Sequence, residues 1–428
     1  MSSNRERKWS FRPDFSDRPA YRGLAITDRA GLISLAGSGF LGHAGSRKSP
    51  GWVSIALLAV MILQLAACGT GSNGYGTESP YNNVAQVISE IGYLNPIGPG
   101  TGVAIFRDSQ VPNKPLLSQV AGVTGAKVDV YYATNPAPPN APWGTQTIAG
   151  ALDASGYLAS VEGALEVDNP SWGLAENGDA YQGLSGQEEA AWNGVVASQM
   201  DLYSYFTNPT NAPNQVPVIL WSLAVPTDGE LTSPAVQAAT QLGTTIPAIA
   251  NRGNVHFYAH NGQNPHAEEL GFVTQETGYT PKMPFATTET GFNDGNNSGS
   301  NNFAGNEVAN AAYMLDNILN LFRDGSRQTD IYELNNDMTN GGSFEDYWGI
   351  FSNDGTPKLS ATYLHNFLAV ISDGKTNANA TTVASLNYNI TGITDAAYTM
   401  LTAKRDGTLD LTLWDDQNLS DANGKQCD

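Results

Sequence analysis

Short apolar runs alternate with stretches of helical periodicity over most of the chain after residue 100. The clearest helical pattern is 309–323, where apolar residues recur at the i, i+3, i+4 spacing and an arginine closes the last turn. Similar patterns cover 83–93, 187–206 and 360–371. Seven apolar runs have the length of buried strands: 102–106, 126–132, 158–162, 216–223, 254–259, 285–288 and 329–334. Strands that alternate with helices indicate a parallel α/β fold.

Seven strands are one fewer than a (β/α)8 TIM barrel needs. The missing strand would precede the helix at 83–93, where only 69–81 is available, and its Gly- and Ser-rich composition is poor for a strand. After Ser372 the pattern becomes β-rich, with a turn at Arg405-Asp406-Gly407 that predicts a hairpin. We therefore predict an α/β TIM barrel over 68–372, followed by a small, partial C-terminal β-sheet domain over 373–428.

The N-terminal segment carries an uncharged apolar run at 53–67, preceded by Arg47 and Lys48. The run is shorter than the about 20 residues that span a bilayer, and with its basic flank it is typical of a signal peptide. It ends in Leu-Ala-Ala-Cys-Gly at 65–69, which resembles the bacterial lipoprotein signal. The resemblance implies that 1–67 is removed and that Cys68 carries a lipid. The alternative is a short apolar helix that ends near a cysteine.

Charge and cysteine content narrow the classes of partner. The net charge is −20, and residues 1–50 contribute +5, so the remainder carries −25. An acidic body is repelled by phosphate, which argues against nucleic-acid binding. Two cysteines exclude a disulfide framework, and His256, His260 and His266 lack the spacing of a metal motif. We expect no metal, no cofactor, a monomer, and membrane contact only through the lipid.

Two glutamates stand where catalytic residues of a TIM barrel lie, at the C-terminal ends of strands. Glu289 follows the strand at 285–288 and precedes Gly291, which we expect to turn the chain. Glu166 follows the strand at 158–162, with Glu162 as a competing acid. Strands four and seven of a barrel face each other across its mouth. The two carboxylates are therefore predicted to reach the about 5–5.5 Å separation of a retaining glycosidase.

Between about 79 and 371 the sequence resembles the clan of retaining glycoside hydrolases built on (β/α)8 barrels. In that clan the acid/base glutamate ends strand four and the nucleophile ends strand seven, which implies these roles for Glu166 and Glu289. The resemblance also implies that Arg107 keeps the nucleophile ionised and that His256 or Tyr258 lies near it. Packing in the barrel wall, or a salt bridge of Arg107 to Asp108, is the alternative.

The predicted function is hydrolysis of β-glycosidic bonds in an extracellular or cell-wall polysaccharide, by an exported, lipid-anchored or secreted enzyme. Trp172 and Trp348 are candidates for stacking on sugar rings, with core packing as the alternative. One position departs from the clan. Leu165 precedes Glu166 where the clan has an asparagine that hydrogen-bonds the sugar 2-hydroxyl. That departure favours the alternative function, a non-catalytic carbohydrate-binding lipoprotein derived from such a barrel.

Overall fold

The structure is a computed structural model, and its strands and helices follow the predicted alternation. It describes residues 84–98, 105–109, 114–132, 148–167, 185–223, 232–259, 265–278, 280, 282–295, 306–336, 347–372, 388–392, 397–404 and 408–416.

The parallel strands are β1 (Ile105–Ser109), β2 (Lys127–Tyr132), β3 (Leu158–Ala164), β4 (Val218–Ile219), β5 (Gly253–Tyr258), β6 (Phe285–Gly291) and β7 (Ser326–Ile331). The helices are α2 (Val84–Tyr93), α3 (Lys114–Thr124), α4 (Ile148–Ala154), α5 (Ser185–Phe206), α6 (Thr232–Gln241), α7 (Pro265–Glu276), α8 (Glu307–Asp324) and α9 (Leu359–Ile371), with a 3-10 turn at Ile246–Ala248.

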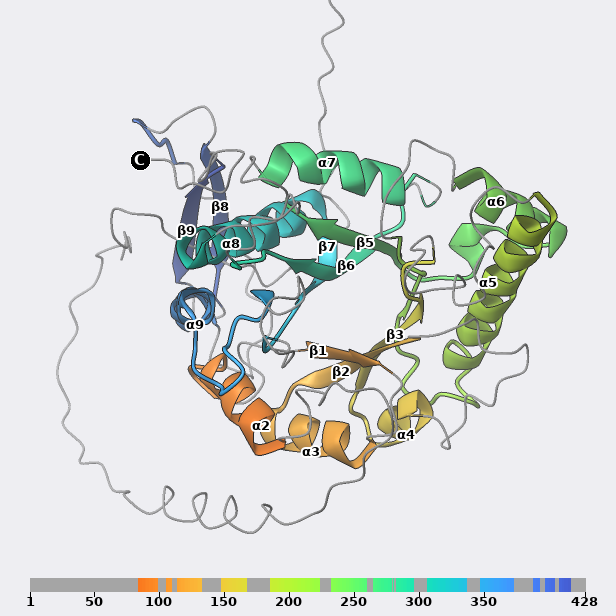
Figure 1. Cartoon of the computed structure of the whole chain (residues 1–428), viewed down its shortest axis with the longest axis horizontal. Helices are drawn as coiled ribbons and strands as arrows, with labels where there is room; N and C mark the ends of the chain where they lie inside the picture. Colours follow the sequence, from red (N-terminus) through yellow and green to blue (C-terminus); the bar gives the residue numbers. More distant parts are fainter. Residues whose placement is uncertain are drawn as a thin grey trace, which may run out of the picture.

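The strands form two parallel half-sheets, ordered β1-β2-β3-β4 and β5-β6-β7. A parallel bridge between Ile219 and Arg252 joins them, and the Leu220 amide donates to the Arg252 carbonyl at 3.0 Å. At the other end of the order, β7 contacts β1. The helices lie around the strands (Figure 1). The α/β class is thus confirmed, whereas the predicted first strand at 69–81 falls outside the described residues, and the eight-stranded barrel stays a prediction.

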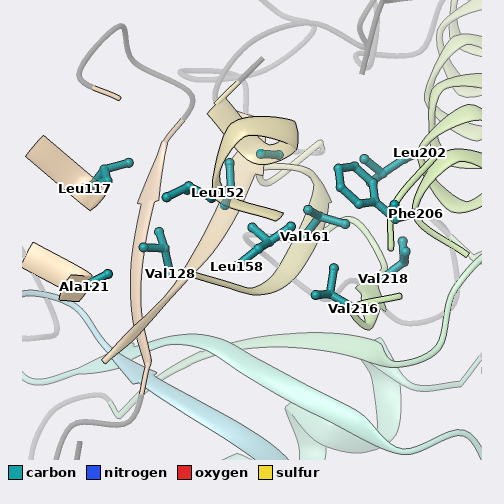
Figure 2. Packing of buried hydrophobic residues seen from close by; sticks show 13 residues of the cluster. Leu117, Ala121, Val128, Leu152, Leu158, Val161, Leu202, Phe206, Val216 and Val218 are labelled. Carbon is teal, nitrogen blue, oxygen red and sulfur yellow. The ribbon is translucent and has the colours of Figure 1, made fainter. Parts of the chain in front are cut away.

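One apolar core fills the space between the first half-sheet and its helices (Figure 2). Leu117 and Ala121 from α3 lie over β2, while Leu202 and Phe206 reach β3 and β4 from α5. Burying each such leucine or phenylalanine contributes roughly 1.5–3 kcal/mol. The outer faces of the strands are therefore fixed against helices, which leaves the inner faces for polar side chains.

A polar network occupies the space enclosed by the strands. Ser160 of β3 donates to Asp129 of β2 at 2.5 Å and lies 3.3 Å from Gln328 of β7. Gln328 accepts from Arg252, just before β5, at 3.2 Å, and donates to Asp330 at 2.9 Å. Burial lowers the pKa of Arg252 despite the charges of Asp129 and Asp330. Since these side chains come from both half-sheets, the two half-sheets face a common interior.

Most strand boundaries differ from the prediction by a few residues, and three of the differences follow here. The run 216–223 forms regular strand only over Val218–Ile219. The residues after Ile219 still hydrogen-bond the chains on both sides, but not in the repeating pattern of a sheet. The Ser222 amide, for example, donates to the Ala164 carbonyl at 3.2 Å. The last parallel strand runs over Ser326–Ile331, which is three residues earlier at each end than predicted. Glu333 therefore lies beyond it. The strand expected at 102–106 is described over Ile105–Ser109.

The C-terminal β-rich segment forms the predicted hairpin. β8 (Ala397–Ala403) pairs antiparallel with β9 (Leu409–Asp415), from Ala397 opposite Asp415 to Ala403 opposite Leu409. Tyr398, Met400 and Trp414 pack into the core cluster formed by α8 and α9. The hairpin is therefore anchored to the helices around the strands. Among the helices of the described ranges, none combines the length and apolarity needed to cross a membrane.

Candidate active site

Glu166 and Glu289 lie together although 123 positions separate them in the sequence. One carboxylate oxygen of each, together with a ring nitrogen of His256, falls within 4.8 Å of the others. Adding about 1.2 Å for each C–O bond to that 4.8 Å places the two carboxyl carbons at most about 7.2 Å apart. That separation is below the about 9.5 Å at which a two-carboxylate mechanism of either stereochemistry would be excluded.

The backbone of Glu166 adopts a conformation that is rare for a residue with a side chain. Its φ is 38°, in the left-handed region. The Glu166 amide donates to the Ser222 hydroxyl at 2.9 Å, and the Val167 amide donates to the Ser222 carbonyl at 3.1 Å. Such a conformation costs of order 1–3 kcal/mol and persists where neighbours fix it, often at functional sites. Ser222 therefore holds the turn that presents Glu166.

Glu289 lies inside β6 rather than after it, because the strand continues to Gly291. The expectation that Gly291 turns the chain is wrong. Gly291 pairs with Tyr258 in the sheet, and a Cβ on Gly291 would lie 2.2 Å from the Tyr332 carbonyl oxygen. The glycine is needed for the close approach of the chain after β7. Glu289 consequently lies within a strand that pairs with β5 on one side and β7 on the other, and it is 9% exposed.

His256 lies between the two carboxylates. Its Nδ1 is 3.0 Å from Glu166 Oε1 and 3.5 Å from Glu289 Oε2. Its Nε2 is 3.0 Å from the Thr288 hydroxyl. The imidazole is almost fully buried. Because His256 Nδ1 lies between Glu166 and Glu289 and can take part in a hydrogen bond with a carboxylate, the closeness of the two carboxylates does not require a metal ion.

Tyr258 fixes the orientation of Glu289 by donating its hydroxyl to Oε2 at 2.7 Å. Burial, followed by the charges of Glu289, Tyr332 and Glu166, raises the pKa of Tyr258 well above its ordinary value. The phenol is therefore a neutral donor at every working pH. Its ring packs edge-on against Trp348 at 4.8 Å and Tyr332 at 6.3 Å.

Glu162, the competing acid, lies beneath this pair. It is completely buried, accepts from Asn254 at 2.9 Å and lies 3.1 Å from the Thr288 hydroxyl. The side chain of Glu166 is 14% exposed. A general acid must reach the substrate within hydrogen-bond distance. The geometry therefore favours Glu166 over Glu162 for direct contact with a substrate.

The remaining predicted site residues divide between described and undescribed positions. Trp348 is 4% exposed and packs against Tyr258. Its ring is therefore a packing partner of Tyr258 and has little surface free for stacking on a sugar. Arg107 lies on β1, but its side chain is outside the described part, and Trp172 and Cys68 fall outside it altogether.

Four partners were not predicted: Thr288, Asn254, Ser222 and Tyr332. Thr288 lies next to Glu289 in a predicted buried strand, and Asn254 opens another. Polar residues within runs predicted to be buried were therefore the available signal.

The chain matches no protein-family model and no curated protein sequence. It is similar to a solved β-glucuronidase of an uncultured Clostridium (13% identity, 67% of this chain, 47% of that chain, TM-score 0.42). It is also similar to a Bacteroides uniformis β-glucuronidase (11%, 68% and 33%, TM-score 0.46) and to an active-site mutant of the Rhizomucor miehei β-1,3-glucanosyltransferase (11%, 66% and 93%, TM-score 0.45). The chain spans less than half the length of the first two. At this level of similarity a function has to be argued from the side chains themselves.

Proposed function

We propose that this chain is a retaining glycoside hydrolase on a (β/α)8 barrel, acting on β-glycosidic bonds of a polysaccharide. One observation carries the proposal. Glu166 and Glu289, from different half-sheets, bring carboxylate oxygens within 4.8 Å of each other around His256. Retaining glycosidases need two carboxyl groups about 5–5.5 Å apart, one to protonate the leaving oxygen and one to attack the anomeric carbon.

The contacts assign the two roles. Glu289 receives the Tyr258 hydroxyl at 2.7 Å, which stabilises its ionised form and aims the other oxygen, so it acts as the nucleophile. Glu166 lies against His256 Nδ1 at 3.0 Å, a partner that can exchange a proton with it, so it acts as the acid and then the base. Glu166 protonates the leaving oxygen while Glu289 bonds to the anomeric carbon. Water deprotonated by Glu166 then releases the sugar from Glu289.

The rival function is a carbohydrate-binding lipoprotein without turnover. Leu165 favours it, since a leucine cannot hydrogen-bond a sugar 2-hydroxyl as the expected asparagine would. The two functions differ in one measurable respect, because both require sugar binding and only one requires the carboxylates to react.

Turnover of a panel of aryl β-glycosides and polysaccharides separates the two. Wild type should release aglycone or reducing ends, and NMR of the first product should show retained anomeric configuration. Glu289→Ala should slow this by at least about 10⁴-fold. The control is Glu90→Gln, which should match wild type. Glu90 is a buried carboxylate on α2 that accepts a hydrogen bond from Asn335. Binding without turnover by wild type would establish the rival.

Export is proposed on the basic flank and the Leu-Ala-Ala-Cys run. Mass spectrometry of the mature protein should find a lipid-modified Cys68 at the N-terminus. An intact Met1 on protein recovered from the cytoplasm would contradict it.

A further inference from the structure

Thr288 determines which ring nitrogen of His256 carries a proton. The Thr288 hydroxyl has a single hydrogen and lies near two acceptors, Asn254 Oδ1 at 2.8 Å and Glu162 Oε1 at 3.1 Å. Its third neighbour is His256 Nε2 at 3.0 Å. The shortest of the three contacts is the one to Asn254 Oδ1, which assigns the hydroxyl hydrogen to that oxygen, so the hydroxyl accepts from His256. Nε2 must therefore be protonated.

The hydrogen bonds of the Asn254 side chain show that its Oδ1, and not its NH2 group, faces the Thr288 hydroxyl. Its Nδ2 donates to Glu162 Oε1 at 2.9 Å and to the Leu220 carbonyl at 3.0 Å. The flipped amide would bring Asn254 Oδ1 against those two oxygens and its NH2 group toward Thr288. Only the orientation with Oδ1 toward Thr288 avoids two contacts between acceptors. Donation therefore runs in one direction, from His256 Nε2 through the Thr288 hydroxyl and the Asn254 amide to Glu162 Oε1.

A protonated Nε2 leaves Nδ1 facing Glu166 and Glu289. A bare lone pair there would confront two carboxylates, so one proton has to be shared among them. Tyr258 already donates to Glu289 Oε2, which favours the ionised form of Glu289. The shared proton is therefore held between Glu166 Oε1 and His256 Nδ1, which are 3.0 Å apart.

We propose that Glu162, acting through Thr288 and Asn254, is a positioning residue that fixes the Nε2–H form of His256, so that Glu166 and His256 together hold the transferable proton. The inference rests on the proposed function. Glu162 Oε1 is 4.0 Å from Nε2, so the charge of this buried carboxylate also stabilises a protonated imidazole. Within the described residues, the carboxylates that face His256 include Glu162 and Glu166, from β3 and just after it, and Glu289 from β6. Glu289 also accepts the Tyr258 hydroxyl, and Tyr332 acts electrostatically on Tyr258.

The kinetic test compares isosteric variants. Glu162→Gln keeps the shape and removes the charge, and Thr288→Val removes the hydroxyl. In both, the shared proton should be lost at lower pH, which moves the alkaline limb of kcat/KM down by about 1–2 pH units. Thr287→Val is the matched control, since Thr287 is buried on the same strand and contacts Ser326 instead. Its limb should coincide with that of wild type. Unshifted limbs in both test variants would overturn the proposal.

A second measurement is independent of turnover. The chain has five histidines, so ¹H–¹⁵N NMR of ¹⁵N-histidine protein, assigned by difference with His256→Gln, can report the tautomer of His256. We expect Nε2–H in wild type and Thr287→Val, and a mixture in Thr288→Val. An Nδ1–H form in wild type would overturn the proposal even in an active enzyme. The expected tautomers in a chain that hydrolyses nothing would support the network and refute the proposed function.

Discussion

Two histidines of this chain lie among carboxylates, in regions with different architecture. His256 lies among Glu162, Glu166 and Glu289, whereas His266 lies near Asp324 and Asp416, with Glu269 next to Asp324. The first group is carried by strands β3, β5 and β6. The second is carried by helix ends of α7 and α8 and by the residue after β9, where the hairpin meets the helices.

The second group includes a permanent cation. Arg323 contacts His266, and its guanidinium lies 3.9 Å from the centre of the Tyr398 ring. Tyr398 in turn bonds His266 Nδ1 at 3.0 Å, and His266 Nε2 lies 3.2 Å from Asp324. An arginine keeps its charge at every accessible pH. These contacts therefore hold the hairpin on α7 and α8 without any proton having to move.

The described members of the first group are an imidazole, three carboxylates, a hydroxyl and a phenol, and most of these gain or lose protons or reorient hydrogen bonds. Both clusters have a histidine among carboxylates, so that feature alone does not separate them. What separates them is the fixed positive charge in one and the movable proton in the other. The following changes test that distinction, in order of decreasing expected effect.

Removing Glu166 should change chemistry and leave folding intact. Glu166→Ala should lower kcat/KM on natural polysaccharide by about 10²–10⁴-fold, because general acid catalysis is lost. Aryl glycosides with very good leaving groups should be spared in the first step, and azide should restore turnover. Asp416→Ala in the other cluster should reduce thermal stability with turnover unchanged. If Glu166→Ala equals wild type on polysaccharide, the acid/base assignment is wrong.

Truncating the hairpin anchor should have the reverse effect. Trp414 is 3% exposed, and its indole donates to Asn320 at 2.9 Å. Trp414→Ala should lower the free energy of unfolding by about 3–5 kcal/mol, measured by denaturant titration. The kcat of the folded fraction at 25 °C should not change. A parallel fall in kcat would show that the hairpin contributes to the site.

Matched phenol deletions compare the two clusters directly. Tyr258→Phe removes a hydrogen bond to a carboxylate, worth about 1.5–3 kcal/mol, and should reduce kcat/KM by roughly 10–150-fold. Its acidic limb should move to higher pH, because ionised Glu289 loses a donor. Tyr398→Phe deletes the phenol beside His266 and should alter only the melting temperature. Equal effects on kcat/KM would erase the distinction.

Glu269 should produce the smallest effect on turnover, because its substitution acts on stability. It is fully buried, and burial, then the charge of Asp324, raises its pKa well above 4.5. Its native pKa exceeds the unfolded one, so its contribution to stability is full below about pH 4.5 and is lost as pH rises toward the native pKa. Glu269→Gln should therefore raise the melting temperature at neutral pH and leave it unchanged near pH 4. Each pKa unit corresponds to about 1.4 kcal/mol. A uniform gain at both pH values would contradict this.

The sequence located the two glutamates because each follows an apolar run, and that local pattern is sufficient to place an acid near a strand end. It favoured Glu166 but left Glu162 as a competing acid, since the burial of Glu162 depends on Asn254 and Thr288 from two other strands. The role of Gly291 was misassigned for a similar reason. The clash that requires glycine there comes from Tyr332, more than 40 positions away.

The bridge between Ile219 and Arg252 divides the chain in a useful way. Glu166 belongs to the segment before it, and His256 and Glu289 belong to the segment after it. A chain cut between Leu223 and Thr232 would yield two fragments, each with one carboxylate of the pair. Neither fragment could perform the proposed reaction alone, so glycoside turnover would become a reporter of fragment complementation. The chain between the two half-sheets is thus a suitable position at which to cut the protein into a split enzyme.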